Sequence, residues 1–600
     1  TSGIPVADIA AGRSEGFRQH FLGTHFFNPP RYLKLLEIIP TADTLPEVVR
    51  FISHFGEYRL GKGIVPCKDT PNFIANRIGF GSGAFALDYI LEQGYTVDEV
   101  DSITGPAIGR PKTATFRLID LVGVDVWEHV GVNLAAAITH DTHALKYHYS
   151  EKANHLIHSM VEKKWLGNKS KQGFYKMVRT PDGGKEFWSL NLKTLEHELP
   201  GEKPRFDSVG AAKGKETLAE KLEVFLSGED RAAQLVQATT YQGFSYASVC
   251  IPEVADTPKP IDDAMRWGFG HQSGPFETWD LVGVAKATAA MKTAGFAPAP
   301  WVDAMLAKGF ESFYEYKGDQ KVGVYNPASG AYEKIARTPG LIVLKEQKDA
   351  GKIVSQNPGA TLVDIGDGVA CVEFQTKMNA IDDDIMNMMN EAMDRAEAGE
   401  FDGLVISNDH ESAFCAGANI FGVVMAAQNG LWDQLEGVVK RLQDTNMRMR
   451  YLSKPVVVAP FGLTLGGGGE ITMHGGRVVA ASELYIGQVE IGVGVIPAGG
   501  GTKEMLRRIV NPVMRIKENP VLPAMQKVFE IIGQAPVATS AVEAQQYAFL
   551  LPTDRIVMNR EHLLAEAKKE VLHMINIGYV APAPEKIYAA GRDTLAALRA

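Results

Sequence analysis

Two glutamates stand beside glycine-rich stretches in the last third of the chain. Glu470 ends the run of glycines at 466–469, and Glu490 lies twenty residues later, just before the stretch GVGVIPAGGG. Glycines let a backbone approach a ligand closely, so amide N–H groups can face an oxygen that gains negative charge during a reaction. The segment FCAGAN at 414–419 offers a second such amide. The addition of water to an activated double bond requires such unpaired amides together with a pair of acid/base groups.

A histidine and a glutamate near the amino terminus have the residue types of an acid/base dyad. His25 lies in HFFNP, and Glu37 follows twelve residues later in LKLLE. A carboxylate fixes the tautomer of an imidazole and raises its basicity, so the ring can take a hydroxyl proton as hydride leaves the same carbon. Asn76, in CKDTPNFIANR, adds an amide that can hydrogen-bond a substrate.

Length and composition limit the class of protein. A chain of 600 residues with 45% hydrophobic content suggests about four domains, and the net charge of -10 argues against a nucleic-acid or anionic-membrane surface. The four cysteines are far apart without metal-ligand spacing, which predicts a reducing, cytoplasmic location and no bound metal. No stretch is long and apolar enough to predict a membrane span. Because the chain begins at Thr1, we interpret it as a piece of a longer protein.

Changes of pattern along the chain predict its domains. Short apolar segments in 1–70 fit strands and loops of an α/β unit, and helical spacing follows. The segment FRLIDLVGV at 116–124 is echoed by FETWDLVGV 160 residues later, which indicates two copies of one helical domain at 71–177 and 230–350. The copies close on GFYK at 173–176 and GVYN at 323–326. The polar stretch 178–229 is expected to be a linker.

A new α/β pattern predicts a separate domain over 355–600. Strand-like segments at 404–407 and 455–460 precede the two glycine motifs, which are expected to open helices where free N–H groups collect. Over about 355–570 these motifs resemble the crotonase (enoyl-CoA hydratase) superfamily, which implies a ββα spiral. The resemblance implies that the amides of Ala418 and Gly467 hold a thioester oxygen while Glu470 and Glu490 bind and activate water. It also places the segment KMNA at 377–380 near the adenine of CoA.

The amino-terminal motifs closely resemble the L-3-hydroxyacyl-CoA dehydrogenase family. That resemblance implies that His25 is the base, that Glu37 orients it, and that the substrate is contacted by Ser2 and Asn76. Two further positions, Asn28 and Lys169, fall where the family contacts the nicotinamide nucleotide.

The helical copies resemble the carboxy-terminal domains of the same dehydrogenases. The first copy carries the basic segment GRPK at 109–112 and is expected to face substrate and cofactor. The second reads HQSGP at 271–275 and is expected to complete the packing. The fold class is therefore multidomain, α/β plus all-α.

The dinucleotide fingerprint of the dehydrogenase family is expected before Thr1. Its GxGxxG turn follows a first strand, and the nearest match here, GFGSGA at 79–84, follows a helical segment instead. We therefore interpret 1–70 as the remnant of a Rossmann domain, expect the main NAD-binding half to lie outside this sequence, and assign 79–84 to helix packing.

Together these features predict a fused β-oxidation enzyme. The hydratase product, a 3-hydroxyacyl-CoA, is the compound that an NAD-dependent dehydrogenase oxidises to 3-ketoacyl-CoA. A thiolase is the natural next partner. Two alternatives stay open, namely a crotonase-type isomerase, which needs only one of the two acids, and an acyl-CoA-binding scaffold with an inactive dehydrogenase half.

Overall fold

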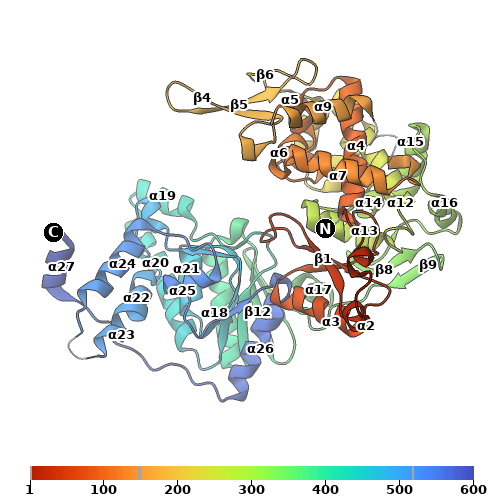
Figure 1. Ribbon diagram of the computed structural model, residues 1–600. Helices are drawn as coiled ribbons and strands as arrows, with labels where there is room; N and C mark the ends of the chain where they lie inside the picture. The colour runs from red at the N-terminus through yellow and green to blue at the C-terminus, as the bar shows by residue number, and fades with distance from the viewer. Residues whose placement is uncertain (1–2, 145–149, 200, 517–518, 600) are drawn as a thin grey trace. The chain divides into compact units, whose positions relative to one another are not determined.

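The computed structural model describes residues 3–144, 150–199, 201–516 and 519–599. These form two compact units, one of residues 1–57 with 62–336 and one of residues 58–61 with 337–600 (Figure 1). The second unit thus begins before the predicted residue 355. The reason is that Leu344, in α17 (Leu344–Asp349), is fully buried in the core of the second unit.

A small sheet in the order β1-β2-β3 opens the first unit. Its strands are β1 (Leu22–Phe26), β2 (Leu35–Pro40) and β3 (Gly63–Pro66), flanked by α1 (Val6–Ala10), α2 (Glu15–Gln19), α3 (Pro46–His54) and the π-helix η1 (Phe55–Arg59). The apolar run of β2 is buried because β2 is the central strand. Strands β1 and β2 are antiparallel, and their register places His25 directly opposite Glu37. The twelve residues between His25 and Glu37 therefore reflect the register in which β1 pairs with β2.

The helix α4 (Ala75–Gln93) carries the glycines of the segment GFGSGA. A methyl group on Gly79, Gly81 or Gly83 would lie within 2.5 Å of an aromatic ring atom, and these rings belong to Phe269, Tyr246 and Trp127 respectively. The glycines thus let aromatic side chains approach the helix backbone. The assignment of this segment to helix packing is confirmed.

Helices of the two repeats make up the rest of the first unit (Figure 1). The first repeat adds α5 (Val97–Ile103), η2 (Pro106–Ile108), α6 (Phe116–Val122), α7 (Val124–Ala137), α9 (Glu151–Glu162) and η3 (Asn168–Ser170). The second consists of α12 (Arg231–Val249), α13 (Pro258–Phe269), α14 (Pro275–Val282), α15 (Val284–Thr293) and α16 (Pro300–Ala307). Antiparallel sheets follow, with β4 (Tyr175–Arg179), β5 (Lys185–Leu190) and β6 (His197–Glu198) after the first repeat and β7 (Tyr314–Lys317), β8 (Gln320–Asn326) and β9 (Ala331–Lys334) after the second.

The DLVGV motifs make the same contacts in both repeats. Asp120 accepts two backbone hydrogen bonds, each of 2.8 Å, at the start of β4, and Asp280 accepts two, of 2.7 and 3.1 Å, at the start of β7. The glycine within each motif, Gly123 or Gly283, has a positive φ, which allows the sharp turn between consecutive helices. Each motif therefore ties a helix to the hairpin that ends its repeat.

This equivalence corrects one predicted match. GFYK opens β4, but GVYN lies within β8, and the true counterpart of Tyr175 is Tyr314. The segment 178–229, expected as a linker, holds β5, β6, α10 (Asp207–Lys213) and α11 (Leu218–Ser227). A capping box between Thr217 and Glu220 begins α11.

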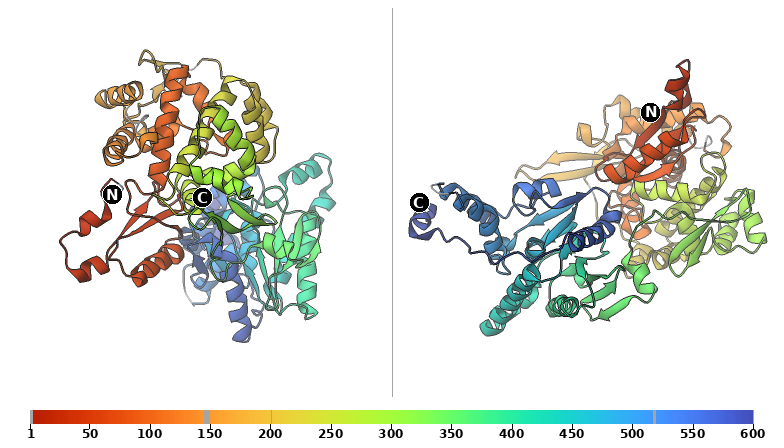
Figure 2. Two further views of the ribbon diagram at one scale, coloured as in Figure 1. Left: turned by 90° about the vertical axis from the view of Figure 1, so that its right-hand side faces the viewer. Right: turned by 90° about the horizontal axis from the view of Figure 1, so that it is seen from below.

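The second unit is built on a large sheet in the order β10-β11-β12-β13-β15-β17-β19 and a small one in the order β14-β16-β18. The large sheet contains β10 (Ile353–Gln356), β11 (Ala360–Asp364), β12 (Val369–Phe374), β13 (Gly403–Ser407), β15 (Val456–Val458), β17 (Arg477–Ala481) and β19 (Arg555–Val557). The small sheet contains β14 (Ala413–Cys415), β16 (Gly462–Leu465) and β18 (Leu484–Gly487). Figure 2 shows the unit, in green to blue, from two further sides.

Helices of the second unit follow and cover these strands. They are α18 (Asp383–Glu397), α19 (Ile420–Gln428), α20 (Trp432–Tyr451), α21 (Gly467–His474), α22 (Gly501–Met505), α23 (Asn511–Met514), α24 (Leu522–Gln534), α25 (Ala541–Gln546), α26 (Leu563–Asn576) and α27 (Gly591–Arg599), with short or π-helical turns η4 (Lys377–Asn379), η5 (Glu490–Val493), η6 (Leu506–Val510) and η7 (Arg560–His562). Each large-sheet strand from β13 to β17 is followed by a small-sheet strand and then a helical segment, which is the predicted ββα spiral.

The small sheet changes how the glycine motifs are positioned. The motifs were expected to follow the strands at 404–407 and 455–460. They instead follow β14 and β16, which pair in parallel, so both motifs leave the same edge of the small sheet. Within the described ranges, no helix combines the length and apolar character needed to span a membrane.

Candidate active sites

The first candidate site is the dyad on β1 and β2. The Nδ1 atom of His25 lies 2.6 Å from Oε2 of Glu37, whose side chain is fully buried. The other oxygen, Oε1, accepts hydrogen bonds from the N–H groups of Ile74 at 3.1 Å and Ala75 at 2.9 Å. These N–H groups lie at the start of α4, where no intrahelical acceptor is available. One carboxylate therefore orients the imidazole and fixes the helix that carries the next residue, Asn76.

The imidazole keeps one side open. Aromatic rings of Phe27 and Phe73 lie edge-on to His25, with centroids 5.0 and 5.6 Å away. The His25 side chain is 15% exposed, so Nε2 is the ring nitrogen left for a substrate. The predicted pairing of His25 with Glu37 is confirmed in geometry, while the chemical roles of the two residues stay predictions.

The other predicted dehydrogenase residues have different environments. Asn76 is half-buried as the second residue of α4, and Ser2 lies outside the described residues. Asn28 is exposed in the loop that follows β1. The ammonium of Lys169 lies 2.7 Å from Oδ2 of Asp125. An exposed pair of this kind contributes only about 0–1 kcal/mol, so Asp125 holds Lys169 weakly.

The second candidate site begins with two backbone amides. A methyl group on Gly467 would lie 3.6 Å from the nitrogen of Ala418, and one on Gly417 would lie 3.8 Å from the nitrogen of Gly467. Ala418 forms a parallel bridge with Ile381, in which the hydrogen bonds are made by its neighbours at 417 and 419. Gly467 is the first residue of α21, whose N–H has no intrahelical acceptor. In the described part of the chain neither amide has a recorded acceptor. The two N–H groups therefore lie close together, and we call this pair the amide cradle.

Glycine is required on both sides of this cradle. Gly417 has a φ of +102° and Gly466 a φ of +52°, which side chains rarely tolerate. A methyl group on Gly468 would lie 2.6 Å from the carbonyl oxygen of Cys415, so α21 could not approach β14 so closely. The glycine run therefore serves close approach of backbone to backbone as well as to a ligand.

The two predicted acids flank the cradle. Glu470 is 2% exposed in α21, and its Oε1 accepts a hydrogen bond of 2.7 Å from the N–H of Gly501. Glu490 begins η5, and both of its carboxylate oxygens are buried with no hydrogen-bond partner among the described residues. A methyl group on Gly466, next to the cradle, would lie 3.2 Å from Oε1 of Glu490. An orphaned buried carboxylate requires a water or ligand to satisfy it.

Burial shifts the pKa of both acids. It raises the pKa of Glu490 to about 7. Burial and then repulsion from Glu490 raise the pKa of Glu470 to about 8, against the opposing hydrogen bonds from the amides of Gly501 and Gly499. Near neutral pH the pair therefore shares protons, which suits one group that donates and one that accepts.

A buried polar cluster supports Glu470, and the sequence interpretation missed it. Nδ1 of His474 lies 2.6 Å from the backbone carbonyl of Glu470, and Lys503 reaches Nε2 of the same ring at 2.8 Å. Lys503 also donates to Glu504, which is fully buried. The stretch PAGGG was noted only as glycine-rich, although its amides bind Glu470 directly. Only the fold brings residues 499–504 back to α21.

Family models match most of these elements and define the class. A model for enoyl-CoA hydratase/isomerase matches residues 368–512. A model for the NAD binding domain of 3-hydroxyacyl-CoA dehydrogenase matches residues 1–70, and one for the carboxy-terminal domain matches 73–177 and 236–317. The class is therefore that of enzymes with both a hydroxyacyl-CoA dehydrogenase part and an enoyl-CoA hydratase part.

Relatives give the same assignment over the whole chain. A probable 3-hydroxyacyl-CoA dehydrogenase of Bacillus subtilis is 42% identical over 600 residues, 100% of this chain and 73% of that protein. A putative fatty acid oxidation complex trifunctional enzyme of Rickettsia felis is 27% identical over 592 residues, 98% of this chain and 74% of that one. The chain belongs to the 3-hydroxyacyl-CoA dehydrogenase family, and it is an enzyme of fatty-acid β-oxidation.

The match to residues 1–70 corrects one prediction. The NAD binding domain was expected to lie mainly outside this sequence, yet its family model matches 1–70. The prediction relied on a single glycine turn, whereas the sheet β1-β2-β3 with its dyad belongs to the same domain. The amino-terminal domain is therefore present, not missing.

Proposed function

We propose that the two sites act in sequence on one class of thioester. Glu470 and Glu490 add water to a trans-2-enoyl-CoA, and His25 with Glu37 then oxidises the resulting (S)-3-hydroxyacyl-CoA to a 3-ketoacyl-CoA. This proposal is supported by the order of chemistry, since the product of the first step is the substrate of the second.

For hydration, the amides of Ala418 and Gly467 hold the thioester oxygen. The water oxygen bonds to C3 while one of its protons passes to one carboxylate. The electrons of the C2–C3 double bond then move through C2 to the thioester oxygen, where the two N–H groups stabilise the negative charge. The other carboxylate, protonated, then delivers a proton to C2 and the thioester carbonyl re-forms. One carboxylate gains a proton and the other loses one, so the pair must exchange a proton before the next turnover.

For oxidation, Nε2 of His25 takes the proton of the 3-hydroxyl group. Glu37 holds Nδ1 in its protonated tautomer and stabilises the imidazolium that forms. NAD, when bound, supplies the hydride acceptor. The exposed Asn28 beside β1 and the exchangeable Lys169 fit a nucleotide, and we propose them as contacts to it. We propose Asn76 and Ser2 as contacts to the substrate.

The observation that carries the hydration proposal is the orphaned carboxylate of Glu490. A structural glutamate would be partnered or exposed, whereas both oxygens of Glu490 are buried beside the amide cradle with no partner in the described part of the chain. A water positioned between Glu490 and Glu470 satisfies both groups.

A crossed pair of variants tests the sequence of steps. Glu490→Gln should reduce NADH production from crotonyl-CoA by about 10²- to 10⁴-fold while leaving oxidation of (S)-3-hydroxybutyryl-CoA unchanged. His25→Gln should abolish NADH production from both substrates while hydration of crotonyl-CoA continues. Retained hydration in Glu490→Gln, or lost hydration in His25→Gln, would contradict the assignment.

Two further features belong to the same proposal. The 3-ketoacyl-CoA product is the substrate class of a thiolase, which we propose as a partner. A cytoplasmic location is supported by the cysteines, since Cys67, Cys250, Cys371 and Cys415 are all buried as free thiols.

A further inference from the structure

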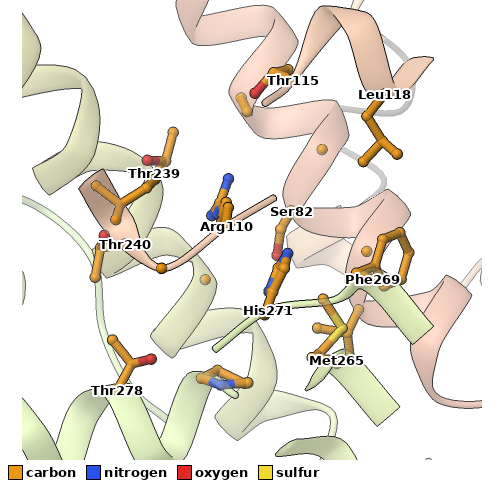
Figure 3. A pocket seen from close by; sticks show the side chains of 18 of the residues that line it. Ser82, Arg110, Thr115, Leu118, Thr239, Thr240, Met265, Phe269, His271 and Thr278 are labelled. Atoms are coloured by element: carbon orange, nitrogen blue, oxygen red, sulfur yellow. The ribbon is translucent and has the colours of Figure 1, made fainter. Parts of the chain in front are cut away.

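A cavity of about 190 Å³ lies between the two helical repeats of the first unit. One wall is α4 together with the loop before α6, and the other is formed by α12 and the loop between α13 and α14 (Figure 3). The two loops are tied together, because the N–H of Gln272 donates a 2.8 Å hydrogen bond to the carbonyl of Gly109. The cavity is therefore a product of the pairing of the repeats.

Arg110 and His271 face this cavity from opposite loops, as Figure 3 shows. Arg110 belongs to the basic segment at 109–112, and the proposed chemistry of neither active site uses it. Among the described residues that line the cavity, these two are the only ionisable side chains. The lining therefore contains a cation and no carboxylate.

Among the residues that the structure describes, none pairs with the guanidinium of Arg110. No hydrogen bond, ion pair or aromatic contact to it is recorded within the described ranges, although burial lowers its pKa. Burial, and then the charge of Arg110, lower the pKa of His271 to about 3, so His271 is neutral at physiological pH. Arg110 is half-buried, and even partial burial of an unpaired charge has a cost that a ligand with an anionic group would offset.

The rest of the lining selects the kind of anion. Ser82 and Thr240 have hydroxyl groups with no recorded partner in the described part of the chain, and both face the cavity. Leu118, Met265 and Phe269 supply an apolar wall. A few polar groups over an apolar surface are typical of a site for a small amphipathic molecule.

We propose that this cavity binds a medium-chain monocarboxylate, with its carboxylate on Arg110 and its hydrocarbon chain along the apolar wall. The planar guanidinium matches a carboxylate with two parallel hydrogen bonds. The volume is somewhat larger than the ~150 Å³ apolar cavity that holds benzene. Inorganic phosphate could pair with the guanidinium of Arg110, but it has no hydrocarbon chain to pack against the apolar wall.

The cavity is separate from the dehydrogenase dyad. The rings of Phe27 and Phe269 lie between them, with centroids 5.6 Å apart, and Phe27 in turn contacts His25. Phe269 also packs against the backbone of α4 at Gly79. Neither His25 nor Glu37 lines the cavity, so we expect the carboxylate and acyl-CoA to bind without competing.

Calorimetric titration of the full chain with octanoate tests the proposal. We expect saturable binding, which Arg110→Met weakens by about 10- to 100-fold, the range of one charge-assisted contact. The matched control is Lys112→Met, an exposed lysine two residues away that does not line the cavity, which should change binding less than twofold. Octanol, which has the chain without the charge, should bind weakly and equally to both variants.

Three results would overturn the proposal. One is octanoate binding that Arg110→Met leaves intact. Another is binding of inorganic phosphate as tight as that of octanoate. The third is loss of octanoate binding when the protein is saturated with acetoacetyl-CoA, which would make the cavity part of the dehydrogenase site. Circular dichroism and an unchanged melting temperature verify that Arg110→Met is folded.

Discussion

Glu37 in the first unit and Glu490 in the second are both removed from solvent, but their oxygens have different partners. Glu37 is 0% exposed and engages His25 and two backbone N–H groups. Glu490 has no recorded partner for either oxygen in the described residues, and burial raises its pKa to about 7. A carboxylate with every oxygen occupied is suited to orienting a base. One without partners is suited to exchanging protons itself.

The largest expected effect comes from disturbing the occupied carboxylate. Glu37→Gln removes the charge that stabilises the His25 imidazolium, so we expect kcat for oxidation of (S)-3-hydroxybutyryl-CoA to fall by about 10²- to 10⁴-fold. Hydration of crotonyl-CoA should be unchanged. The control is Glu47→Gln, an exposed glutamate on α3. Oxidation in Glu37→Gln within twofold of wild type would show that Glu37 is only structural.

The next largest effect concerns the amide cradle. In Gly468→Ala the new methyl group would meet the carbonyl of Cys415 at 2.6 Å, which forces α21 and the amide of Gly467 to move. Losing one oxyanion donor costs about 10²- to 10³-fold in kcat. Gly437→Ala is the control, because nothing lies within 4 Å of its position on α20. Equal hydration rates in the two variants would argue against the cradle.

The pH dependence of hydration distinguishes the two carboxylates further. The pKa values of about 7 and about 8 for Glu490 and Glu470 in the free protein predict a bell-shaped profile of kcat/KM. Below this range the base becomes protonated, and above it the acid becomes ionised, with a change of about tenfold per pH unit on each side. The two carboxylates interact, so the two pKa values of the profile are properties of the pair. Glu470→Gln removes one of the titrating groups, so the rate should then depend on pH on only one side of the optimum. A flat profile between about pH 5 and 9 would contradict the sharing of protons by the two carboxylates.

The smallest effect is on stability. Between pH 4.5 and about 7 the folded state binds the Glu490 proton more tightly than the unfolded state, so the free energy of unfolding falls as pH rises. Glu490→Gln cannot titrate, so its free energy of unfolding should not fall in this range. The difference in the free energy of unfolding between Glu490→Gln and wild type should therefore be about 1–3 kcal/mol more favourable to the variant at pH 8 than at pH 5, a few degrees in Tm. Scanning calorimetry checks this expectation, and the control is Glu436→Gln, which changes an exposed glutamate on α20. An equal difference at both pH values would show that Glu490 does not titrate there.

The sequence predicted the features that depend on local spacing. His25 and Glu37 are brought opposite by the register of one antiparallel pair, and the repeat of DLVGV marks equivalent contacts in both halves of the helical part. The strands β14 and β16 were missed, because segments of three and four residues carry too little periodicity to stand out. Arg110 and His271 were quoted in their motifs, but their shared cavity depends on contacts between distant segments. Such pairing is not encoded in any short window.

The position of Glu37 has a consequence for assembly. Its second oxygen caps the first turn of α4, the helix that also bears Asn76 and one wall of the repeat cavity. One carboxylate thus joins the imidazole of β1 to the start of α4, so a displacement of α4 would leave Oε1 of Glu37 without its two donors.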